Sequence, residues 1–184
     1  MDYEATILAV ARSLDDVATE VDTWFDKPVE LRAYKPASGG WSVDEVLEHI
    51  SLTNSFLLLT CRKHTSIAIH RFNRGDRVPR GESDLRSLQV IGHLGSFVWA
   101  RPEHMEPKGE VSSAEVRTTL RDQWRDCHTL LTDLKGGIGA LSKITMTVNS
   151  LGKIDLYQWL YFLTMHAHRH VEQMNRIAQE YGLH

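Results

Sequence analysis

Several residues and segments that mark whole protein classes are scarce or missing in this sequence of 184 residues. It has two cysteines, Cys61 and Cys127, so a disulfide framework is not the basis of the fold, although one bridge between them stays open. Buried free thiols in a reducing compartment are the expected state, and the cytoplasm is therefore the expected location. The first residues are acidic where a secretory signal is basic, and no run approaches the roughly 18 uncharged apolar residues of a membrane span.

Motifs of common enzyme classes are also missing. The sequence has no glycine-rich phosphate loop, no nucleophile elbow and no Cys-x-x-Cys pair. A net charge of -3 and a pI near 6.4 argue against nucleic acid as the main partner. The basic stretch 62–86 is interpreted as a solvated surface, because hardly any aromatic residues interleave with its charges. The length fits one domain that spans residues 1–184.

What the sequence does have is helical periodicity. In four long segments the apolar residues recur at steps of three and four, the spacing of an amphipathic helix that buries one face. Ser42, Ser112 and Asp155 begin three of these segments, and each is followed three residues later by Glu or Gln, which completes a capping box. The four helices are expected at about 3–25, 42–69, 112–134 and 155–181.

Between residues 71 and 110 this periodicity disappears, and glycine and proline interrupt the chain repeatedly. About forty residues are too many for a tight turn between neighbouring helices, but they suit a crossover along a bundle. One short helix or extended piece is expected within 85–99. Four amphipathic helices without a convincing strand pair predict an all-α four-helix bundle.

Three histidines occupy inward positions of these helices. His166 and His170 lie four residues apart, one turn above the other on one face, so their imidazoles can converge on one ion. His49 lies on the inward face of the second helix. Three inward histidines from two helices resemble the three-ligand arrangement of catalytic zinc sites. The alternative is a set of core histidines that are hydrogen-bonded to neighbouring helices. His168 is rotated by about 200° from His166 and is expected in solvent.

Other residues are candidates for the surroundings of this site. Gln173, one turn past the last of the three histidines, could orient a ligand or the substrate. Trp41 could stack near the mouth, and Thr53 lies on the same inward face as the first histidine. His93 in the crossover could cover the site. No carboxylate on the inward faces is suited to act as a general base.

The motifs that contain these histidines resemble those of the DinB/YfiT-like superfamily. "GGWSVDEVLEHI" is similar to the family's entry into the second helix, where a Trp-Ser pair precedes the first metal histidine. "NSLGKIDLYQWL" and "WLYFLTMHAHRHVEQMNRI" resemble its approach to the last helix and its closing H-x-x-x-H motif. The resemblance implies an up-down-down-up four-helix bundle with a long crossover between helices 2 and 3, and a homodimer. It also implies that His49, His166 and His170 are the metal ligands.

The resemblance further implies a range of activities. Members of this family transfer a low-molecular-weight thiol to electrophiles, catalyse thiol-dependent isomerisation or are assigned metal-dependent hydrolysis. A divalent-metal-dependent transfer of a thiol co-substrate to an electrophilic small molecule is the expected function. The alternatives are a metal-dependent hydrolase and a non-catalytic metal-binding bundle that acts in dimerisation or stress response. Three imidazoles suit zinc, nickel, iron or copper; zinc or nickel is expected, and iron also fits. Neither nucleic acid nor a membrane is an expected partner.

Overall fold

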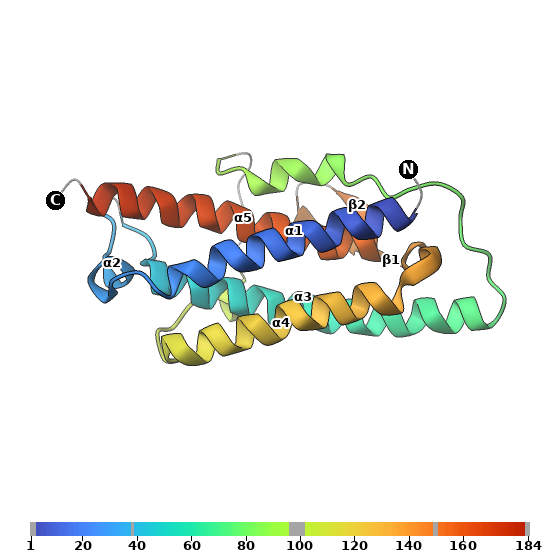
Figure 1. The fold of residues 1–184 in the computed structure, drawn as a ribbon, viewed down its shortest axis with the longest axis horizontal. Coiled ribbons are helices and arrows are strands. Elements are labelled where there is room, and N and C mark those ends of the chain that lie inside the picture. Colours follow the sequence, from blue (N-terminus) through green and yellow to red (C-terminus); the bar gives the residue numbers. More distant parts are fainter. Residues whose placement is uncertain (1–2, 38, 96–101, 149–150, 183–184) are drawn as a thin grey trace.

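The computed structural model describes residues 3–37, 39–95, 102–148 and 151–182. These residues are mostly helical, as predicted. Four long helices lie along the long axis of the molecule (Figure 1), and each packs against two of the others. They are α1 (Tyr3–Trp24), α3 (Val43–Asn73), α4 (Ser113–Asp133) and α5 (Leu156–Tyr181).

The predicted helix starts are confirmed. Complete capping boxes are formed by Ser42 at α3, by Ser112 at α4 and by Asp155 at α5, and each satisfies backbone N–H groups that the first turn leaves without a helical partner. The second long helix extends to Asn73 rather than ending at about residue 69. No glycine or proline interrupts residues 70–73, and the first glycine, Gly75, takes a positive φ of 92°, a conformation that ends helices.

Short helical elements connect the long ones. They are α2 (Val29–Ala33) and the 3₁₀ helices η1 (Arg86–Gly92), η2 (Glu103–Met105) and η3 (Lys135–Leu141). The crossover between α3 and α4 leaves α3 at one end of the molecule, and η1 then lies along α5 before the chain returns to begin α4 at the opposite end (Figure 1). Leu88 and Ile91 of η1 are fully buried. The short helix expected within 85–99 is therefore present and contributes to the core.

The expectation of no strand pair is wrong. Strands β1 (Lys143–Met146) and β2 (Gly152–Asp155) form an antiparallel hairpin directly before α5. Ile144 and Met146 alternate with exposed residues on β1. Four residues per strand are too few for this alternation to be separated from chance in the sequence.

The core lies between the facing sides of the long helices. Tryptophans 24, 124 and 159 are all buried in it. Cys61 and Cys127 are buried and free, so the described part of the chain contains no disulfide. None of the described helices is long and apolar enough to cross a membrane.

Candidate metal centre

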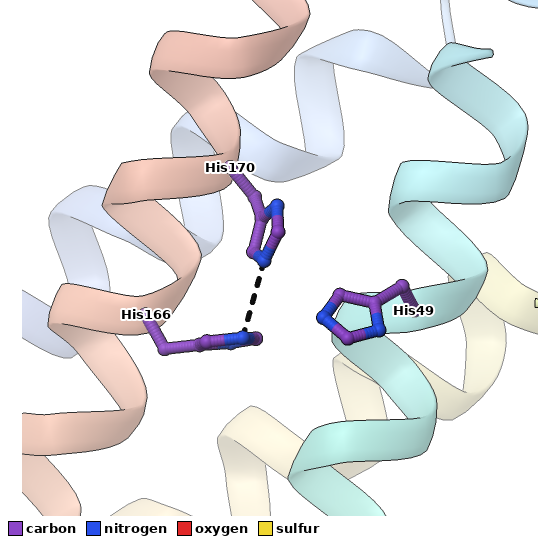
Figure 2. A group of neighbouring side chains, drawn as sticks. All are labelled: His49, His166 and His170. Carbon is purple, nitrogen blue, oxygen red and sulfur yellow. Dashed lines mark hydrogen bonds between the residues drawn. The ribbon is translucent and has the colours of Figure 1, made fainter. Parts of the chain in front are cut away.

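Three imidazoles meet between α3 and α5. His49 projects from α3, and His166 and His170 project from successive turns of α5, so that the rings point toward one another (Figure 2). Nε2 of His166 and Nε2 of His170 are 3.1 Å apart. The ring centroid of His49 lies 5.3 Å from that of His166 and 4.7 Å from that of His170. One potential ligand atom from each ring lies within 4.8 Å of the other two.

These distances fit a shared metal ion. Zinc–nitrogen bonds of about 2.0–2.1 Å at tetrahedral angles place two ligand nitrogens roughly 3.3 Å apart. The 3.1 Å between Nε2 of His166 and Nε2 of His170 is close to that separation, and a donor set of three imidazoles suits several divalent metals. The three buried histidines could therefore hold a metal ion.

Neighbouring groups fix the tautomers of two of the rings. Nδ1 of His49 is 2.7 Å from the carbonyl oxygen of Met105, and Nδ1 of His170 is 2.9 Å from Oε1 of Gln173. Because these oxygens can only accept, each Nδ1 carries the proton and donates it. The lone pair of each ring then lies on Nε2, the atom that faces the other histidines. This is the arrangement in which outer hydrogen bonds orient metal-binding imidazoles.

His166 is the most deeply buried of the three rings. Burial lowers the pKa of His166 well below its usual value, and the neighbouring His170, His49 and Arg169 lower it further. The ring is thus neutral over the physiological pH range. A neutral imidazole is the form that binds a metal.

The three histidines line a cavity of about 540 Å³. Its walls come from α3, α5, β1 with the residues that follow it, and the crossover, which contributes Leu94, Pro102 and Met105. Most of the lining side chains are apolar, and the described lining residues include no Asp or Glu. A concave, mostly apolar cavity with a few convergent polar groups is typical of a small-molecule site.

Of the four neighbours singled out in the sequence, Trp41, Thr53 and Gln173 line this cavity. The ring centroid of Trp41 lies 4.6 Å from that of His49. Thr53 is buried, and its Oγ1 has no hydrogen-bond partner among the described residues. Gln173 contacts His170, as noted above. His168 does not line the cavity, so the rotation used for the prediction holds. The expectation that it lies in solvent is only partly met, because the residue is half-buried and its Nδ1 is 3.3 Å from a carboxylate oxygen of Glu20 on α1.

The contacts that attach the crossover to the site were not predicted. Glu48 does not line the cavity, yet it is buried and accepts the backbone N–H groups of Lys108 and Gly109 at 3.1 and 2.9 Å. On α5, Nη1 of Arg169 donates to the carbonyl oxygen of His93 at 2.7 Å. His93, expected to cover the site, is therefore attached to it through its backbone. In each of these contacts the two partners are far apart in the chain, and one of them lies in the crossover, which has no periodicity. No local sequence pattern therefore predicts the contact.

Comparison with known proteins supports the resemblance seen in the motifs. The sequence model of the DinB superfamily matches residues 8–174, which include all three histidines. No curated protein and no solved structure matches the chain significantly. The family match covers most of the chain, and we conclude that the protein belongs to the DinB superfamily.

Proposed function

We propose that the protein binds one divalent metal ion, zinc or nickel, through His49, His166 and His170 and transfers a low-molecular-weight thiol to an electrophilic small molecule. The observation that carries this proposal is the convergence of three imidazoles from two helices in a largely apolar cavity of about 540 Å³. A divalent cation held by neutral imidazoles retains its charge and lowers the pKa of a thiol or water bound to it.

The residues around the imidazoles would keep the site in one geometry. The carbonyl of Met105 and the side-chain amide of Gln173 hold the rings of His49 and His170 in the tautomer with a lone pair on Nε2. Trp41 packs on the first of these rings. Such outer contacts keep ligands oriented before the substrate arrives, so that little reorganisation is needed on binding.

The cavity walls would hold the electrophile beside the sulfur. In the transfer the thiolate sulfur attacks an electrophilic carbon; a new C–S bond replaces the C–halogen bond of an alkyl halide, and halide leaves while the thiol proton passes to solvent. Apolar side chains such as Phe162 and Trp159 line the cavity. They would exclude water, which would otherwise compete for the electrophile. Thr53 Oγ1, buried at the cavity wall, is the candidate to hydrogen-bond a bound molecule.

The composition of the cavity favours thiol transfer over hydrolysis. Metal-dependent hydrolysis commonly uses a carboxylate as general base toward the attacking water, and no Asp or Glu is among the described lining residues. A thiol loses its proton without a general base more easily than water does, because a thiol is far more acidic than water. The hydrolase and the non-catalytic bundle are therefore the alternatives that the experiment must separate from the transferase.

The experiment is a matrix of thiols and electrophiles assayed with purified protein of known metal content. Loss of bacillithiol, mycothiol, glutathione or cysteine is followed in the presence of an alkyl halide or an epoxide, with and without chelator. We expect metal-dependent consumption of at least one thiol, its loss in His170→Ala, and its retention in His168→Ala, the matched control on the same helix. Circular dichroism checks that both variants fold. Absence of thiol consumption above background in the metal-loaded protein would contradict the proposal.

The proposal also covers the number of domains, the order of the helices, the oligomeric state and the location of the protein. We propose a single domain with the up-down-down-up helix order and a homodimer in the cytoplasm, whose substrate is a small molecule. The helix order is supported by Figure 1, where α3 and α4 run in one direction and α1 and α5 in the other. Two free buried cysteines fit a reducing compartment. Light scattering on the purified protein tests the dimer.

A further inference from the structure

The cavity continues along both ligand-bearing helices beyond the three imidazoles. On α3 its lining reaches Phe56, seven residues after His49. On α5 it reaches Trp159, seven residues before His166. Seven helical residues span roughly 10 Å. Because α3 and α5 run in opposite directions (Figure 1), both walls extend toward the same end of the molecule. The cavity therefore has a section about 10 Å long beyond the imidazoles.

The two helices are joined at the far end of this section. Nε1 of Trp159 donates to the backbone carbonyl oxygen of Leu57 at 3.0 Å. This bond uses the one polar atom of the indole, so the ring adds only apolar surface to the cavity. Phe162, on the next turn of α5 toward the histidines, also lines the cavity and is buried. Aromatic rings therefore bound the cavity on the side of α5.

The hairpin provides a further wall of the same section, through residues 145–148. We call the section the apolar extension; its lining consists of Thr53, Phe56, Leu57, residues 145–148, Trp159 and Phe162. None of these residues is charged, and three threonines are its polar members. Moving a charged or strongly polar group from water into such surroundings costs free energy unless a partner compensates it, whereas an apolar group gains free energy there.

The two substrates of the proposed transfer differ in how well they suit the apolar extension. The low-molecular-weight thiols considered above carry several polar or charged groups along their length. An uncharged section lined by aromatic and aliphatic side chains would leave those groups without partners. An apolar electrophile has no such groups and gains from burial in proportion to the area removed from water. The extension therefore suits the electrophile.

We propose that the electrophile carries an unbranched hydrocarbon chain of about six to eight carbons that lies in the apolar extension, with its reactive carbon at the three histidines. The length follows from the advance of about 1.3 Å per carbon in an extended chain. This inference rests on the proposed function. With a primary alkyl halide, the new C–S bond forms at the terminal carbon, halide leaves and the thiol proton passes to solvent, while the chain itself is unchanged.

The test measures the binding of probes that share one head group and differ only in the length of their tail. Alkyl hydroxamates bind a divalent metal through the two oxygens of the head group. Protein loaded with cobalt(II) is titrated with the series from acetohydroxamate to decanohydroxamate, and the visible absorption of cobalt reports binding. We expect the affinity to rise about two- to fourfold for each added methylene. It should level off at about eight carbons, where the chain reaches the end of the extension.

Two variants locate the chain. Phe56→Ala shortens a wall residue that is 44% exposed, so the fold should survive. It should weaken the binding of octanohydroxamate about tenfold, the effect of losing roughly 50–60 Å² of apolar contact, and leave acetohydroxamate unchanged. Leu59→Ala is the matched control, because this apolar side chain of the same helix is 65% exposed and is not among the described lining residues. It should bind both probes as the wild type does.

Two results would overturn the proposal. One is an affinity that does not rise with chain length in the wild type. The other is a rise that Phe56→Ala leaves unchanged, because the chain would then lie elsewhere. In the thiol assay, kcat/KM should be higher for 1-bromooctane than for 1-bromobutane, and Phe56→Ala should reduce this difference while Leu59→Ala retains it.

Failure of the proposed function gives a different result. If the hydroxamates bind with the expected gain but neither bromoalkane consumes thiol, thiol transfer fails and the apolar extension stands as a binding site for a hydrocarbon chain. If cobalt does not bind, calorimetric titration of the metal-free protein with the alcohols from 1-butanol to 1-octanol decides. An affinity that rises with chain length and falls in Phe56→Ala would retain the site, and equal or absent binding along the series would overturn it.

Discussion

Glu48 provides the sharpest test of how the crossover is attached to the bundle. Its carboxylate accepts the backbone N–H groups of Lys108 and Gly109 at 3.1 and 2.9 Å. A hydrogen bond to a charged group contributes about 1.5–3 kcal/mol. The two donors belong to exposed residues, so water can replace the carboxylate in a variant, and the cost should lie near the lower end for the pair. Glu48→Ala should therefore reduce the free energy of unfolding by about 3 kcal/mol, twice the lower value for a single bond.

Urea unfolding of the metal-free protein, followed by circular dichroism, measures this change. Chelator is needed because a metal that binds only the folded state adds its own stabilisation. For a chain of this length the loss corresponds to a decrease in Tm of about 6–12 °C. Glu103→Ala is the matched control, since it removes an exposed carboxylate of the same crossover and should change stability by less than about 0.5 kcal/mol. Equal stability of the two variants would refute the reasoning, because Glu48 would then contribute nothing through its two bonds.

Three further predictions concern other parts of the molecule. His166→Ala should abolish stoichiometric metal binding while His168→Ala retains it, and elemental analysis that shows equal loss in both would contradict the geometry of α5. Asp22→Asn should cost about 1 kcal/mol at pH 7, since hydrogen bonds from Arg117, together with other contacts, hold the pKa of Asp22 well below its usual value. This stabilisation is complete above the unfolded-state value near 4 and is lost as the pH falls toward the lower folded-state value, so urea curves of wild type and variant should converge in acid. Asn54→Leu should raise the free energy of unfolding by about 1–3 kcal/mol, because both polar atoms of this fully buried side chain lack a hydrogen-bond partner among the described residues; a loss of stability in urea titration would show that the amide is satisfied.

The long helices and the cluster of histidines were predictable because their signals are local. A capping box spans four residues and the apolar period repeats over every turn, so the starts of α3, α4 and α5 follow directly from the sequence. The same periodicity places His49, His166 and His170 on inward faces. Their meeting at one point additionally required the packing of α3 against α5, which the family resemblance implied.

The hairpin and the attachment of the crossover were not predictable, because they leave no local signal in the sequence. Glu48 and Lys108 are 60 residues apart, and Arg169 and His93 are 76 apart. Each pair joins a helix to a stretch without periodicity, so neither residue alone predicts its partner. The strands β1 and β2 are too short for alternation to stand out.

Part of the cavity wall lies outside the ligand-bearing helices, and this has a consequence for evolution. The three histidines lie on α3 and α5, whereas Leu94, Pro102 and Met105 and the residues around the end of β1 lie outside the long helices. Substitutions and changes of length are tolerated far better in such segments than in a packed helix. A lineage could therefore acquire a new substrate by successive changes in the walls while the spacing of the three imidazoles is inherited unchanged.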